Sequence, residues 1–221
     1  MQAKENNIPN LFIFTIIIFF NKFSLYHSIN QNTIIIMKKS IILTILIFST
    51  TQAIGNQDPF FSGYTQQITF NIGAGVNSGF LIPPPSQFVP YTTFQVQYSQ
   101  PTTFFSLPAR QSISAVINVG YGQKYGWHWE DFSIPIITLG IDTTPIYGQD
   151  WYTFIGIGVG MQAQQNARIG SKLLFSFKAG YGYRLSDCTS LELFMQHMSN
   201  GNTAPENNSY AFYGLGLSYS F

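Results

Sequence analysis

Eight segments between residue 68 and the C-terminus carry an apolar side chain at about every second position, and this spacing limits the fold more than any other feature. Seven segments alternate regularly, and one, residues 132–141, is a less regular apolar run. The segments cover residues 68–76, 94–98, 112–121, 132–141, 155–161, 173–184, 191–196 and 213–221. Because successive strand residues point to opposite faces, each segment predicts a β-strand with one apolar face and one face of small or polar residues.

The composition indicates where the apolar faces point. Only 9% of the residues are charged and 17% are aromatic, whereas soluble domains carry about 25% charge. No apolar run reaches the ~18 residues of a membrane helix, but each segment is close to the ~9–11 residues with which a strand crosses a bilayer. The chain is therefore predicted to be all-β, an eight-stranded antiparallel transmembrane β-barrel of the bacterial outer membrane.

A closed barrel leaves no sheet edge in lipid, where each unpaired backbone group costs several kcal/mol. The small polar face is expected to point into the narrow lumen, where Lys178, Arg184 and Glu192 would lie and pair. The alternative is a soluble β-sandwich, which would have to bury the apolar face of residues 213–221 in a core.

The first 53 residues are interpreted as separate from the barrel. Residues 37–53, with Lys38 and Lys39 before an apolar stretch, are typical of a signal peptide. Residues 1–36 would then be an upstream extension or a mis-set start, and residues 54–221 the barrel. The latter part holds six Lys or Arg and eight Asp or Glu, a net charge of −2, so nucleic acid is not an expected partner.

An even number of strands and an exported N-terminus predict that both chain ends lie in the periplasm. The loop of residues 199–210 would then face the cell exterior. The aromatic C-terminal residue, Phe221, resembles the signal that outer-membrane barrels present to their assembly machinery, which is therefore an expected partner.

The stretch LELFMQHMSNGN, residues 191–202, places two reactive side chains where a strand becomes a loop. His197 and Ser199 continue the odd-numbered apolar positions and so share the lipid-facing side of the strand. One interpretation is simply a strand ending near the membrane interface. The other is a catalytic pair, since a neutral histidine can accept the proton of a serine nucleophile. The Asn200 amide and a backbone N–H near Gly201 would then form an oxyanion hole.

The segments FMQHMSNG and YGLGLSYSF, joined by a short polar loop, resemble the outer-membrane lipid A 3-O-deacylases (PagL), also described as acyloxyacyl hydrolases. The resemblance implies an eight-stranded barrel that hydrolyses the 3-O-linked acyl chain of lipid A, or lipopolysaccharide, in the outer leaflet. It implies Ser199 as nucleophile, His197 as base, Asn200 as oxyanion residue with a backbone N–H near Gly201, and no metal or other cofactor. A homodimer is left open.

One position departs from the family pattern. The family has a glutamate near the start of its last strand, and with the C-termini aligned that position holds Ala211. The only acid in the preceding loop is Glu206, which would orient His197 as the third catalytic residue, and the Asn207 amide is the other candidate. Two alternatives to an esterase are therefore kept: a non-enzymatic structural or adhesin-like barrel, and a barrel of this family that has lost catalysis.

Overall fold

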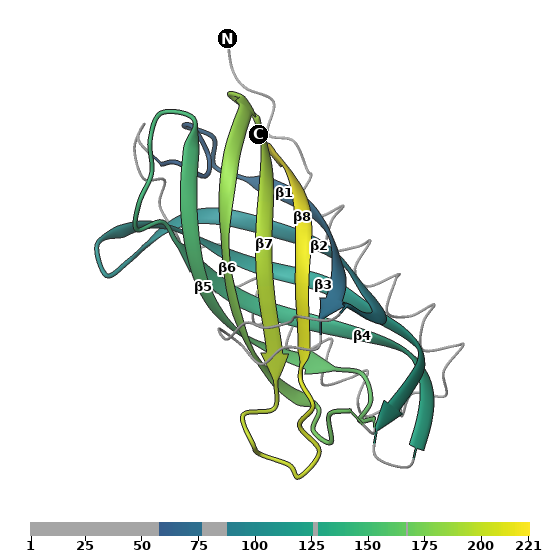
Figure 1. Ribbon diagram of the computed structural model, residues 1–221. Helices are drawn as coiled ribbons and strands as arrows, with labels where there is room; N and C mark the ends of the chain where they lie inside the picture. The colour runs from purple at the N-terminus through teal and green to yellow at the C-terminus, as the bar shows by residue number, and fades with distance from the viewer. Residues whose placement is uncertain (1–57, 77–87, 126–127, 167) are drawn as a thin grey trace. The chain divides into compact units, whose positions relative to one another are not determined.

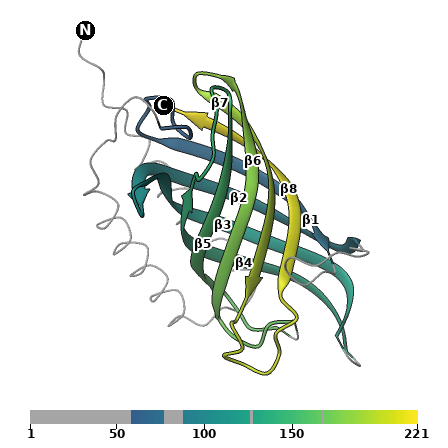
Figure 2. The ribbon, with the colours of Figure 1, turned by 60° about the vertical axis from the view of Figure 1, so that its left-hand side comes forward.

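The computed structural model describes residues 58–76, 88–125, 128–166 and 168–221, so the predicted extension and signal peptide lie outside the described residues. The eight strands are β1 (Gln67–Val76), β2 (Phe88–Phe104), β3 (Leu107–Tyr125), β4 (His128–Thr143), β5 (Trp151–Gln162), β6 (Leu173–Ser186), β7 (Thr189–Ser199) and β8 (Tyr210–Ser220). Each strand pairs with its sequence neighbours and β1 pairs antiparallel with β8, which closes the barrel (Figures 1 and 2). Among the described residues no helix is long and apolar enough to cross a membrane.

The barrel has two different ends. We call the end with the β2–β3, β4–β5 and β6–β7 connections and the C-terminus the turn end, and the opposite end the loop end. The β5–β6 and β7–β8 loops, residues 163–172 and 200–209, belong to the loop end (Figure 1). Phe221 lies just beyond β8, where it exchanges two backbone hydrogen bonds with Gln66 and so continues the β1–β8 seam.

Three strands are longer than the sequence pattern predicts. β2, β3 and β4 contain 17, 19 and 16 residues, whereas the prediction placed every strand near ~9–11 residues. The additional residues continue the hydrogen-bonded pairing beyond the alternating segments, as in the pairs from Gln100↔Gln111 to Phe104↔Leu107. Alternation detects only the part of a strand that has one face on lipid, so it misses these extensions.

The apolar faces point outward, as predicted. On β8, Tyr213, Leu215, Leu217 and Tyr219 are between 42% and 54% exposed, while Ser218 and Ser220 are buried inside. A soluble sandwich would have hidden the first four side chains in a core, so that alternative is wrong. The outward faces of β1, β5, β6, β7 and β8 instead expose the apolar side chains that lipid requires.

Two apolar clusters occupy the lumen. The cluster at the loop end consists of Tyr91, Val116, Ile134, Ile136, Ile169, Leu174, Met198, Tyr210 and Phe212. The cluster at the turn end consists of Phe60, Phe61, Tyr152, Phe154 and Phe194. Inward-facing glycines make room for these rings: a Cβ on Gly182 would lie 2.2 Å from the Tyr152 ring. The segment before β1 supplies Phe60 and Phe61, so it fills the lumen at the turn end.

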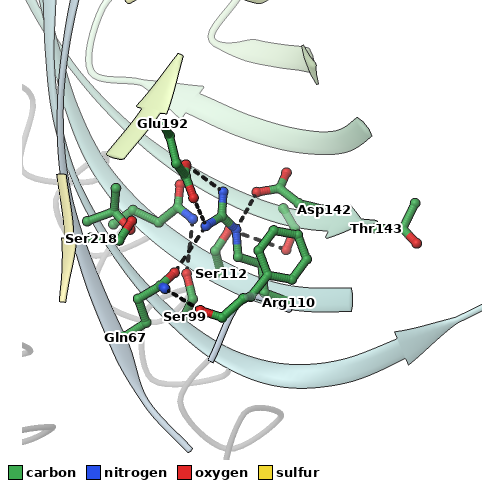
Figure 3. Close-up of polar contacts among 12 residues, drawn as sticks. Gln67, Ser99, Arg110, Ser112, Asp142, Thr143, Glu192 and Ser218 are labelled. Carbon is green, nitrogen blue, oxygen red and sulfur yellow. Dashed lines mark hydrogen bonds and ion pairs between the residues drawn. The ribbon is translucent and has the colours of Figure 1, made fainter. Parts of the chain in front are cut away.

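A buried ion network lies beside the turn-end cluster (Figure 3). Arg110 is fully buried, and its guanidinium donates to Asp142 at 2.9 Å and to both carboxylate oxygens of Glu192, at 2.5 and 2.9 Å. Gln67 accepts another hydrogen bond from Arg110 at 3.0 Å, and the Tyr152 hydroxyl donates to Glu192 at 2.7 Å. These contacts satisfy charges that would otherwise be costly to bury.

The predicted pairing of Lys178, Arg184 and Glu192 is therefore only partly right. Glu192 is inside but pairs with Arg110, a residue outside the alternating part of its strand. Lys178 is buried with its ammonium 4.8 Å from the centre of the Phe194 ring. Arg184 is half-buried and donates to the carbonyl oxygens of Gln149 and Pro59.

Replacing Glu192 with Gln should destabilise the barrel by about 3 kcal/mol, because Arg110 would keep a buried charge with a weakened partner set. Urea unfolding of the refolded barrel, followed by its heat-modifiable gel mobility, measures this difference. Asp187→Asn, in the exposed β6–β7 turn, removes the same charge from a surface and should change stability by less than about 0.5 kcal/mol. Equal stability of the two variants would contradict the importance of the network.

Candidate active site at the loop end of β7

His197 and Ser199 lie at the loop end of β7 on its outward face. The preceding outward residues, Leu191 and Leu193, are exposed on the apolar belt, whereas Glu192 between them is buried in the lumen. His197 and Ser199 are half-buried and continue the outward series. The structure thus places both residues on the predicted lipid-facing wall, at the end opposite to the C-terminus.

The neighbouring strands surround this pair with apolar side chains. His197 is paired with Phe177 of β6 and Ala211 of β8, and Ser199 is paired with Phe175 of β6. Ala211, where the aligned family pattern has glutamate, is therefore the direct cross-strand neighbour of His197. An alanine side chain has no oxygen that could accept a hydrogen bond from an imidazole.

Asn200 organises the loop that follows. It is fully buried, and its amide nitrogen donates to the carbonyl oxygens of Ala204 at 3.3 Å and Glu206 at 2.9 Å. Its amide oxygen accepts from the backbone of Asn202 at 2.8 Å. Both N–H groups of this amide are thus engaged within the loop, which gives Asn200 a structural task beside its predicted role as an oxyanion donor.

Gly201 brings the backbone close to the outward face beside Ser199. Its φ of +61° is in the left-handed region, which glycine adopts without steric cost. A Cβ at this position would lie 2.9 Å from the ring of Phe175, the residue paired with Ser199. The turn therefore needs glycine for its conformation and for its contact with that ring.

The two residues expected to orient His197 are held in the same loop. Asn207 accepts from the Asn200 backbone at 3.1 Å and donates to the Asn202 side chain at 2.9 Å. The exposed Glu206 side chain lies against Gly170 of the β5–β6 loop, where a Cβ would be 2.3 Å from a carboxylate oxygen. Glu206 would have to turn away from Gly170 to approach His197.

Arg168 is the structural residue that the sequence analysis missed. It lies in the β5–β6 loop, is buried, and donates to the carbonyl oxygens of Ser209 and, at 3.1 Å, Asn208. Its guanidinium also lies 4.6 Å from the Tyr91 ring centre and 5.7 Å from that of Tyr210. Arg168 therefore joins the β7–β8 loop to the loop-end cluster of the lumen. A single arginine in a polar loop gives no pattern that could reveal this.

Tyr91 extends this connection to the strand beside His197. Its hydroxyl lies 2.9 Å from the carbonyl oxygen of Ala211 and accepts a hydrogen bond from the Ala211 N–H at 3.1 Å. Arg168 also donates to this hydroxyl, at 3.4 Å. The lumen thus holds the backbone of Ala211 from inside, while its side chain faces the position of His197.

No group of three His, Cys, Asp or Glu side chains that could hold a metal ion occurs in the part of the chain that the structure describes. What the geometry offers is a serine and a histidine on one lipid-facing wall, followed by a glycine turn. These groups are suited to acyl transfer from a lipid ester.

Comparison with known protein families shows to which family this chain belongs. Residues 92–220, more than half of the chain, match the sequence profile described as lipid A 3-O-deacylase (PagL). This chain belongs to the PagL family. The matched range includes β7, the β7–β8 loop and β8, so the candidate site lies within the part that defines the family. The chain is accordingly an outer-membrane β-barrel of a lipid A deacylase family.

Solved structures with similar architecture include other small barrels. The outer membrane enzyme PagL is 18% identical, with 70% of this chain and 99% of that chain covered and a TM-score of 0.48. Neisserial surface protein A (NspA) is 12% identical, with 71% and 97% covered and a TM-score of 0.48. The N-terminal β-barrel domain of Pseudomonas aeruginosa OprF is 11% identical, with 72% and 98% covered and a TM-score of 0.46. No curated protein matches the chain.

Replacing Arg168 with Gln should loosen the β7–β8 loop without opening the barrel, because the guanidinium contacts to Asn208, Ser209 and Tyr91 are lost. Hydrogen–deuterium exchange should become faster in residues 200–209 and stay unchanged in β5 and β6. Lys172→Gln is the matched control, since Lys172 is an exposed cation of the same loop. Unchanged exchange in residues 200–209 of the Arg168 variant would rule out the connection.

Proposed function

We propose that this chain is an outer-membrane esterase that hydrolyses the 3-O-linked acyl chain of lipid A, with Ser199 as nucleophile and His197 as general base. Family membership supports the reaction class. The observation that carries the assignment of residues is the shared outward face of His197 and Ser199 at the loop end of β7. An outward face contacts lipid, so the ester of an outer-leaflet lipid can reach these side chains directly.

The reaction follows from the two side chains. His197 takes the hydroxyl proton of Ser199 as its oxygen attacks the ester carbonyl carbon, and the bond from that carbon to the sugar oxygen breaks. The sugar oxygen leaves with the proton from His197. Water then attacks the acyl group on Ser199, gives a proton to His197, and releases a fatty acid and the restored serine.

The negative charge on the carbonyl oxygen needs a donor near Ser199. We assign this role to the Gly201 N–H group, since the turn at Gly201 folds against Phe175 beside Ser199. Asn200 supports this donor by holding the loop, because its amide N–H groups already donate to Ala204 and Glu206. Preorganised backbone donors of this kind typically contribute about 3 kcal/mol to transition-state stabilisation.

Orientation of His197 is assigned to Glu206, with the Asn207 amide as the alternative. Both follow Ser199 in the same loop, and Glu206 is its only acid. The exposed Glu206 side chain lies against Gly170, so this assignment includes a rotation of that side chain. Triad members contribute unequally, so a weakly placed acid is compatible with slower but measurable catalysis.

Export and orientation complete the proposal. Residues 37–53 would direct export, Phe221 would engage the assembly machinery, and the loop end would face the exterior, where lipid A is found. The C-terminus and the short turns would then lie on the periplasmic side.

Cells that produce the chain should contain lipid A lacking one hydroxyacyl group, detectable by mass spectrometry of extracted lipid A. Ser199→Ala and His197→Ala should abolish this loss, because each removes one half of the catalytic pair. Ser133→Ala on β4, whose paired neighbour is Val119 of β3, is the control and should act as the parent chain does. Intact lipid A with a correctly folded parent barrel would remove the enzyme assignment.

Ala211→Glu should raise the rate of deacylation by about 10-fold or more, since it places a carboxylate directly opposite His197. Initial rates on purified lipid A in detergent measure the effect. Ala211→Gln, which has the same size without the charge, should give a smaller gain. A rate equal to or below that of the parent, with heat-modifiable mobility retained, would show that Ala211 is not the missing position.

A second candidate function is a non-catalytic barrel of the same family. It is favoured by one observation, the alanine paired with His197. The two candidates predict different mass spectra of lipid A from cells that produce the parent chain. They also differ in whether Ala211→Glu creates activity where none existed.

A further inference from the structure

The β2–β3 hairpin extends beyond the strands on either side at the turn end. Pairing of β1 with β2 ends at Gln67↔Ser99, and pairing of β3 with β4 ends at Ala109↔Thr143. The two strands of the hairpin stay paired with each other as far as Phe104↔Leu107. The tip is visible as the teal loop that projects at the left of Figure 1.

The tip carries no charge and exposes large apolar side chains. Residues 100–109 read QPTTFFSLPA, without Asp, Glu, Lys, Arg or His. Phe105 is 85% exposed, and Leu107 is 37% exposed. The rings of Phe104 and Phe105 pack edge to face with their centres 4.5 Å apart. A turn in contact with water alone would normally carry polar residues at these positions.

The backbone conformation of this turn is one that Phe and Ser seldom adopt. Phe105 and Ser106 have φ values of +49° and +64°, as in the type I′ turns that favour Asn, Asp and Gly. A bulky side chain at positive φ costs roughly 1–2 kcal/mol. Such strain persists where a residue serves a purpose other than local stability. Here the strained residue is the most exposed large apolar side chain of the described residues.

Two features favour lipid over a protein strand as the partner. Pro101 and Pro108 flank the tip and lack the N–H donor that an added strand would use. The neighbouring β4–β5 turn, linked to the hairpin by a hydrogen bond from Thr144 N to Pro108 O at 2.9 Å, exposes further apolar residues, Ile146 and Tyr147. The exposed apolar side chains of the tip therefore adjoin those of a second turn at the same end of the barrel. Outer-membrane barrels carry girdles of aromatic residues at both membrane interfaces.

We propose that the β2–β3 tip is a membrane-interface anchor, with Phe104, Phe105 and Leu107 inserted among the headgroups of the leaflet on the turn side. The anchor fixes the depth and tilt of the barrel at the end opposite to the candidate active site. It is independent of the proposed catalysis, so neither proposal depends on the other.

A nitroxide spin label at Thr103→Cys, in a Cys188→Ser background, tests the anchor in vesicles of phosphatidylethanolamine and phosphatidylglycerol. Cys188 is the only cysteine of the chain. Power-saturation electron paramagnetic resonance compares access of oxygen, which is concentrated in the bilayer, with access of a water-soluble nickel complex. The reference is a label on native Cys188 in the β6–β7 turn of the same end. The label at residue 103 should show a higher ratio of oxygen to nickel access than this reference.

Phe105→Asn then separates insertion from folding. Asparagine suits a positive φ, so the variant should unfold at the same or a higher urea concentration than the parent. Its label at residue 103 should nevertheless shift towards the Cys188 ratio, because the inserting ring is gone. The proposal would be overturned if, in the chain that retains Phe105, the label at residue 103 were as accessible to nickel as the label at Cys188. A ratio that Phe105→Asn leaves unchanged would also overturn it.

Discussion

Closure of the backbone hydrogen-bond ring is the interaction on which the rest of this structure depends. In lipid every strand must find partners on both sides, and the β1–β8 seam provides the last set. Once the ring is closed, each strand residue within the apolar belt faces either the lumen or lipid. That division explains why the lumen accepts an ion network around Arg110 and why the wall outside is apolar.

Because of this division, part of the structure can be predicted from the sequence. His197 and Ser199 were placed on the outward face because their spacing matches that of Leu191 and Leu193, and strand parity is a local property. The strand number and the outward direction of residues 213–221 followed from equally local patterns, and closure followed from the cost of an open sheet edge in lipid. The lengths of β2, β3 and β4 did not, because pairing beyond the apolar belt leaves no alternation in the sequence.

Contacts between distant segments could not be predicted from the sequence. Arg110 pairs with Glu192 across the lumen, and Arg168 reaches the β7–β8 loop from the β5–β6 loop. Neither arginine has a charged neighbour in sequence that indicates its partner. The hydrogen bonds of the Asn200 amide differ from these long-range contacts, since their acceptors lie within six residues in the sequence. A buried asparagine at the start of a turn often bonds to nearby backbone, and this offered a local signal.

The lumen and the proposed active site are connected through the backbone they share. Adjacent residues face opposite sides, so a contact on the inner face fixes the position of the outer face one residue away. Tyr91 and Arg168 hold Ala211 and the β7–β8 loop from within, while His197 and Ser199 lie on the other side of the same wall. A packed lumen, with apolar clusters and a buried ion network, is therefore more than filling for a narrow barrel. It gives a site on a single-layered wall the rigid support that a globular enzyme obtains from a core.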